Sequence, residues 1–138
     1  MTDDEEYRFH PEDFDENGEL IDGRGEETIA PLVIVGGLGA GLALFFADPF
    51  VDPVGVGETE IALRNVSAFV FAAGLSAGSG IYLRGGNRPL GAVHALAALG
   101  WVLLGVGEIR SNDALFSIGG IALVVGAVAL VALVRRSD

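Results

Sequence analysis

The sequence predicts an all-α integral membrane protein, with four transmembrane helices in an up-down antiparallel bundle and a disordered acidic N-terminal tail. Two observations predict this: four uncharged apolar runs of similar length, and acidic charge concentrated ahead of the first run. The runs cover residues 29–47, 65–83, 89–107 and 114–134. As helices they would be about 28 to 32 Å long, matching the roughly 30 Å hydrocarbon core of a bilayer. The chain therefore divides into a tail, 1–28, and a transmembrane domain, 29–138.

The tail carries nearly all of the net charge. Residues 1–28 hold 12 acidic residues and two arginines, a net charge of −10, whereas the other 110 residues hold 7 acids and 6 arginines, a net charge of −1. So polar a segment buries too little apolar surface to offset its ordering entropy, and we expect it to be disordered when free. It lacks the basic start of a signal peptide, so we expect the first span to stay uncleaved.

All eight basic residues are arginine, and the chain has no lysine and no cysteine. The absence of cysteine excludes disulfides, thiolate metal sites and cysteine nucleophiles. An acidic, lysine-free composition resembles that of small four-span membrane proteins of salt-loving (halophilic) archaea. At 1 M salt the Debye length is only about 3 Å, so repulsion between carboxylates is largely screened. The resemblance is one of composition and implies no activity.

One segment of the tail has the spacing of a calcium loop. Asp13, Asp15 and Asn17, followed by a glycine, match the first half of an EF-hand. The position of its bidentate glutamate is occupied by Arg24. A Ca²⁺-binding tail on a membrane-anchored sensor is therefore the weakest of our interpretations. The tail also interleaves aromatic residues with acids, a pattern that suits docking on basic surfaces of partner proteins.

The first two spans carry pairs of glycines at helix spacing. Gly37 and Gly41 form one GxxxG step, and Gly74 and Gly78 form another. Glycines let helix backbones approach closely, and dispersion contacts then drive association in lipid. We expect these helices to pack on each other or on another protomer.

The connection between these spans, residues 48–64, is the longest in the domain. Two Asp-Pro pairs indicate turns at its start. We expect helix from about Glu58, with Glu60 and Arg64 paired at i,i+4 spacing. Its four acids, Asp48, Asp52, Glu58 and Glu60, form either a solvated loop or a cation-gathering surface.

Short polar turns join the later spans, at 84–88 and 108–113, so these spans should be antiparallel neighbours. Ser111, Asn112 and Asp113 are suited to cap the last helix. Six arginines lie on the side that carries the tail and the C-terminus, and two lie on the other side. The positive-inside rule then places both termini in the cytoplasm of a multi-pass cell-membrane protein.

His94 is the only histidine inside an apolar run, and so it is the polar candidate within the membrane. A haem or zinc site would need further ligands, which the other spans lack unless a dimer brings two His94 side chains together. The alternative is a neutral histidine bonded to a backbone carbonyl, to Ser76 or Ser79, or to interfacial water.

The predicted function is that of a non-catalytic structural or accessory membrane protein, as a subunit of a larger complex or as a homo-oligomer. We expect no enzyme activity and no cofactor, because the spans offer no carboxylate, no nucleophile and no second histidine. The partners are lipid and other membrane subunits, and no basic surface for nucleic acid is present. The alternative is a small oligomeric channel or transporter, in which the acidic loop collects cations and His94 lines the pore.

Overall fold

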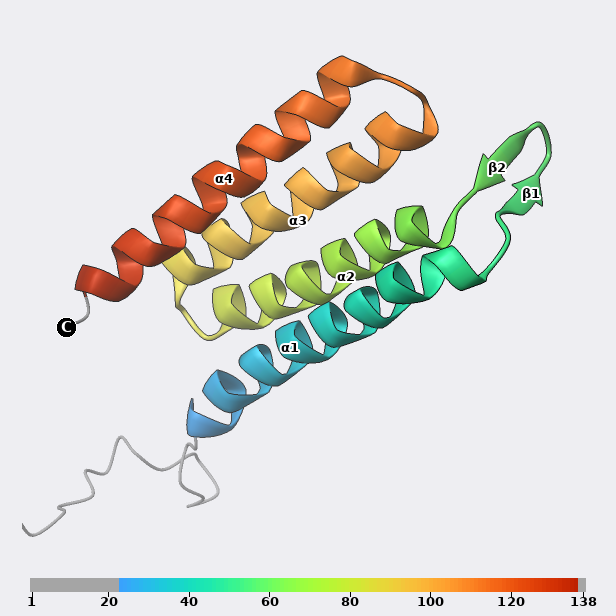
Figure 1. Cartoon of the computed structure of the whole chain (residues 1–138). Helices are drawn as coiled ribbons and strands as arrows, with labels where there is room; N and C mark the ends of the chain where they lie inside the picture. Colours follow the sequence, from blue (N-terminus) through green and yellow to red (C-terminus); the bar gives the residue numbers. More distant parts are fainter. Residues whose placement is uncertain (1–22, 137–138) are drawn as a thin grey trace, which may run out of the picture.

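The computed structural model describes residues 23–136, with side chains from Ile29 onward, and this part of the chain is mostly helical (Figure 1). Its elements are α1 (Gly23–Ala47), the short helix η2 (Asp48–Phe50), strands β1 (Val54–Val56) and β2 (Thr59–Ile61), α2 (Leu63–Arg84), α3 (Arg88–Ile109) and α4 (Asp113–Arg136). Four helical segments, each 22 to 24 residues, are long and apolar enough to cross a membrane: Ile29–Phe50, Leu63–Arg84, Arg88–Ile109 and Asp113–Arg136. The prediction of four helices of membrane-spanning length is confirmed.

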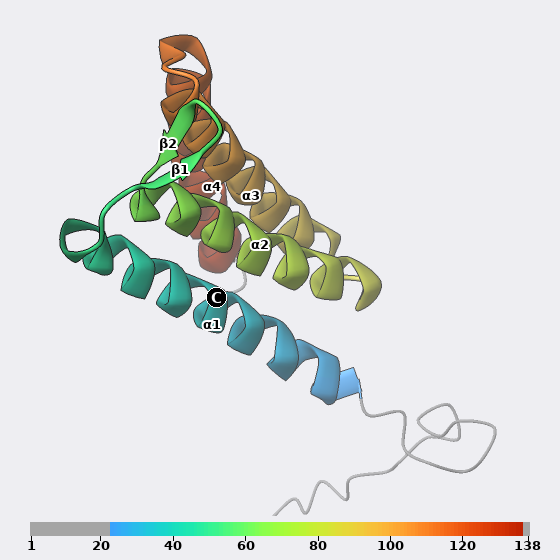
Figure 2. The same ribbon diagram turned by 90° about the vertical axis from the view of Figure 1, so that its right-hand side faces the viewer.

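The helices pack in series, each on its neighbour in the chain (Figures 1 and 2). Consecutive helices run in opposite directions: Gly37 of α1 lies against Gly74 of α2, whereas the earlier Ile34 lies against the later Gly78. Among the described residues, α1 and α4 share no extended interface. The helices therefore form an open array rather than a bundle closed around a common core.

The interior of this array is small and lies along α2 and α3. Its buried apolar residues are Ala30, Ile34, Ala68, Phe71, Ala72, Leu75 and Ala98. The rings of Phe71 and Trp101 join α2 to α3, with centroids 4.5 Å apart. In an 18-residue apolar stretch of each span, 17% of the α1 stretch and 11% of the α4 stretch is buried, against 44% for α2 and 33% for α3. The two outer helices thus leave most of their apolar surface uncovered.

The connection between α1 and α2 differs from the sequence prediction. Helix was expected from about Glu58, but Val54–Val56 and Thr59–Ile61 form an antiparallel hairpin, and α2 begins at Leu63. Gly57 has φ +64°, a conformation that two-residue hairpin turns require. β-Branched residues on both sides of this turn favour strand over helix. With Glu60 on a strand, the predicted pair between Glu60 and Arg64 is not formed.

The remaining turns are short and capped by asparagines. The Asn87 side chain accepts from the backbone N–H of Leu90, and the Asn112 side chain accepts from that of Leu115 at 3.0 Å. Of the three residues suited to cap α4, Asn112 therefore provides the side-chain cap. Asp113 lies in the first turn of the helix, where its charge suits the helix dipole.

Candidate functional site

A cluster of four polar side chains joins three helices at the end that carries the hairpin. We call Asp48, Arg64, Asn65 and Glu108 the Arg64 cluster. The Arg64 backbone N–H donates to Asp48 Oδ1 at 2.9 Å, and its guanidinium contacts Asp48 Oδ2 at 3.3 Å and Glu108 Oε1 at 2.7 Å. One arginine thereby connects η2, directly after α1, to the start of α2 and the end of α3.

Asn65 is the buried member of this cluster, with 5% of its surface exposed. In the amide orientation that gives both the oxygen and the nitrogen of the side chain a suitable partner, the nitrogen donates to Glu108 Oε1 at 3.3 Å and to Oε2 at 3.0 Å. Ser67, also buried, donates to the Arg64 carbonyl at 2.6 Å. Glu108 therefore receives donors from two successive residues of α2. This fixes the distance between the start of α2 and the end of α3.

The chemistry of the cluster is that of a structural clamp. Its two carboxylates accept hydrogen bonds from Arg64, so they do not form an uncompensated anionic site. No group of three histidine or acidic side chains able to hold a metal ion occurs in the part of the chain that the structure describes. The Arg64 side chain is 52% exposed, and exposed ion pairs contribute about 0–1 kcal/mol each. The main contribution of the Arg64 cluster is therefore to fix the positions of the helix ends.

His94 lies in the first third of α3 and is half-buried. Its Nδ1 is 2.8 Å from the Leu90 carbonyl oxygen, and its ring stacks obliquely on Tyr82 with centroids 5.3 Å apart. A carbonyl only accepts, so Nδ1 must carry a proton, and a neutral ring then has Nε2 as its acceptor. Ser79, considered above as a partner, instead donates to the Gly91 carbonyl at 2.7 Å.

The four predicted packing glycines lie between α1 and α2. A Cβ atom added to Gly37 would come within 2.6 Å of Gly74 Cα, so these two backbones touch. Gly41 lies against the ring of Phe71, and Gly78 lies against Ile34. Similar close approaches between later helices were not anticipated from the sequence. For example, a Cβ added to Gly107 would come within 2.6 Å of the Phe116 backbone nitrogen.

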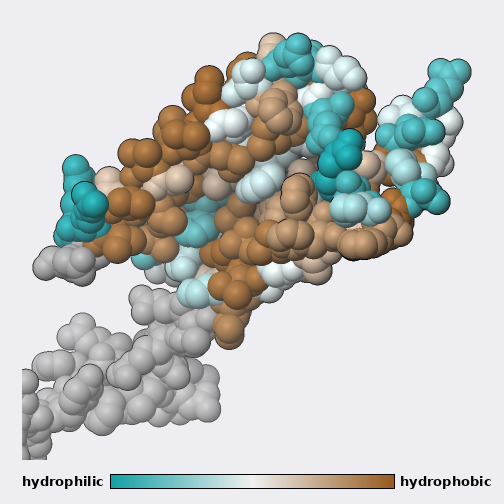
Figure 3. All heavy atoms as spheres, in the orientation of Figure 1, coloured by the Kyte–Doolittle hydropathy of each residue, from teal (hydrophilic) through white to brown (hydrophobic). Residues whose placement is uncertain are grey.

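Charged side chains from Ile29 to Arg136 gather at the two ends of the helices. Arg84, Arg88, Arg135 and Arg136 lie at one end, and Asp48, Asp52, Glu58, Glu60, Arg64, Glu108, Arg110 and Asp113 lie at the other. Figure 3 shows the result, because hydrophobic atoms cover the length of the helices and hydrophilic atoms lie toward their ends. Among residues 29–136, one end thus carries only positive side chains, and the other is net acidic.

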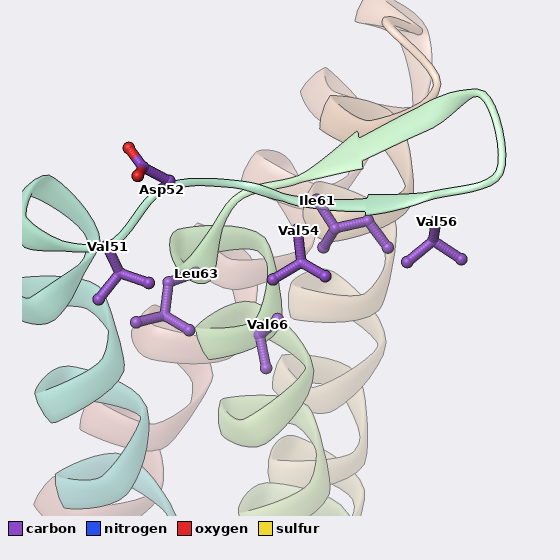
Figure 4. A pocket seen from close by; sticks show the side chains of 7 residues that line it. All are labelled: Val51, Asp52, Val54, Val56, Ile61, Leu63 and Val66. Atoms are coloured by element: carbon purple, nitrogen blue, oxygen red, sulfur yellow. The ribbon is translucent and has the colours of Figure 1, made fainter.

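Two features complete the inventory of candidate sites. The calcium candidates Asp13, Asp15 and Asn17 lie outside the described residues, as does most of the acidic tail. An apolar groove of about 280 Å³, not anticipated from the sequence, lies between the hairpin and the start of α2 (Figure 4). The sequence feature that could have indicated this groove is the alternation of valines ahead of a glycine turn.

Comparison with known proteins found no relative of this chain. No family model, no curated protein and no solved structure matches it.

Proposed function

We propose that the protein spans a membrane four times and acts as a non-catalytic structural or accessory component of that membrane. The observation that carries this proposal is the exposure of the two outer helices. Large apolar side chains of α1 and α4 stand uncovered, among them Leu32, Val35, Phe46, Ile121, Val124 and Val128. Apolar faces of this size need lipid or other subunits to cover them.

The packing between helices supports a structural role. Glycines bring the backbones together at each interface, and the 29–47, 65–83, 89–107 and 114–134 segments contain no formally charged residue. Proton-coupled transporters place such residues within their spans to carry the coupling ion. Ser79, a buried polar residue of α2, donates to the Gly91 carbonyl of α3 and so links these two helices.

The proposed orientation places both termini in the cytoplasm. The end formed by the α2–α3 turn and the C-terminus of α4 carries four arginines and, from Ile29 to Arg136, no acid. The positive-inside rule assigns this end to the cytoplasmic side. The acidic tail then extends from the same end, where it is available to cytoplasmic partners.

Native mass spectrometry after gentle extraction from the native membrane at high salt tests this role. We expect the protein as a homo-oligomer or with other membrane subunits bound. A lone monomer, with no associated chain in any detergent that keeps it folded, would contradict the proposal.

Flux from liposomes separates this role from that of a channel. We expect no flux of ions or small polar solutes from liposomes that contain the purified protein. Flux that changes between about pH 5 and 8 and loses this dependence in His94→Ala would favour a channel gated by His94.

A further inference from the structure

The hairpin between α1 and α2 has two chemically different faces. In its register Val54 pairs with Ile61 and Val56 pairs with Thr59, while Glu60 pairs with Gly55. Successive strand residues point to opposite sides, so the valines and Ile61 share one face and Glu60 lies on the other. Figure 4 shows Val54, Val56 and Ile61 on the same side of the ribbon.

The apolar face of the hairpin is turned toward the helices and is only partly covered by them. Val54, Val56 and Ile61 line the groove together with Val51, Leu63 and Val66, which come from the preceding loop and the first turns of α2 (Figure 4). Val54 remains 61% exposed and Val56 remains 58% exposed. Asp52 at the rim points away from the groove.

The hairpin lies across the ends of the helices instead of continuing them. Figure 4 shows it crossing above α2, so that its apolar side chains point along the helices. Phe45, Phe46 and Phe50 are exposed at the same end, Phe50 by 87%. The apolar face of the hairpin and these exposed phenylalanines therefore lie at the same end of the helices.

We propose that this hairpin lies on the surface of the bilayer, with Val54, Val56 and Ile61 against lipid of the adjoining leaflet and Glu60 toward water. The inference rests on the proposed membrane function, because it places the ends of α1 and α2 at the membrane surface. Lipid is the occupant that fits, because the groove opens directly beside the first turn of a proposed span and is lined almost wholly by apolar side chains.

Site-specific fluorescence tests the position of the hairpin, and the absence of cysteine allows single labels. Val56→Cys reports on the apolar face and Glu60→Cys on the opposite face, each carrying an environment-sensitive fluorophore in phosphatidylcholine vesicles. We expect lipids with a nitroxide near the top of the acyl chain to quench the Val56 label several-fold more than the Glu60 label. Val54→Cys and Gly55→Cys form a second pair, since an added Cβ at Gly55 meets nothing within 4 Å.

A label at Val124→Cys, exposed near the middle of α4, separates the two proposals. Deep nitroxides should quench it if the helices span the bilayer, and absence of quenching there would overturn the proposed membrane function. Quenching at Val124 with equal quenching on the two hairpin faces, or with none on either, would overturn the hairpin inference alone. Circular dichroism confirms that each labelled variant keeps its helical content.

Discussion

At Gly37 the backbones of α1 and α2 are so close that no side chain fits between them. Gly39, two residues later, is on the open side of α1, where an added Cβ meets nothing within 4 Å. The two glycines look alike in sequence, and only their neighbours differ. Gly37 therefore determines how closely two helices approach, whereas Gly39 does not.

Gly37→Ala and Gly39→Ala should accordingly differ in their effects on the free energy of unfolding. Gly37→Ala forces the helices apart, and overpacking of this kind costs about 1–3 kcal/mol of unfolding free energy. Gly39→Ala should leave stability unchanged or raise it by up to about 1 kcal/mol through helix propensity. Denaturant unfolding in detergent micelles measures both. Equal effects at the two positions would show that α1 and α2 do not make this contact.

Asn65 acts by donating to Glu108 from a buried position. Asn65→Leu keeps the approximate size of the side chain but removes the amide donors, and we expect a loss of about 1–3 kcal/mol. In a Glu108→Leu background the same substitution should cost clearly less, because the acceptor is already gone. A double-mutant cycle of unfolding free energies provides this comparison. Additive losses would mean that Asn65 and Glu108 are not bonded.

At the scale of elements, Arg64 connects parts of the chain that no local pattern relates. Glu108 is 44 residues away in sequence and Asp48 is 16 residues away on the other side. The helices α1, α2 and α3 pack through apolar and glycine contacts along their length. The Arg64 cluster fixes their ends and, with them, the base from which the hairpin extends.

Arg64→Gln removes both ion pairs of this cluster. Each exposed pair contributes about 0–1 kcal/mol, so the variant should lose at most about 2 kcal/mol at low salt and less as salt screens the charges. Amide hydrogen exchange should also speed up where α1 ends and α2 begins. The matched control is Arg110→Gln, at an arginine for which the described residues show no side-chain bond. The clamp role would be wrong if both variants behaved alike.

At the scale of the whole molecule, charge is sorted to opposite ends of the helices. Among residues 29–136, four arginines lie at one end of the helices, and the hairpin end is net acidic. In the proposed orientation, the positive-inside rule assigns the end with the four arginines to the cytoplasmic side. The open series of helices then presents α1 and α4 as the two outer edges.

Single cysteines in this cysteine-free chain report the orientation. Gly85→Cys lies in the α2–α3 turn at an ordinary φ of −72°, and Glu58→Cys lies at the tip of the hairpin. In intact cells a membrane-impermeant maleimide should label Glu58→Cys and should label Gly85→Cys only after detergent is added. The reverse pattern would place the termini outside. Labelling of both cysteines from one side would mean that α2 does not cross the membrane.

The sequence by itself determined the four helices, because a run of about twenty apolar residues without charge is a local property of the chain. It also determined the unequal charges at their ends. The prediction of helix from Glu58 was wrong, because a two-residue turn at Gly57 and the pairing of Val54 with Ile61 outweigh local helix spacing.

Only the tertiary structure decided which glycines lie against a neighbouring helix, that the helices pack in an open series, and that Arg64 pairs with Asp48 and Glu108. These contacts join residues distant in sequence, and they depend on how each helix is rotated about its axis. Helices that are apolar on nearly every side do not encode that rotation in their periodicity. It is set by where missing side chains let two backbones meet.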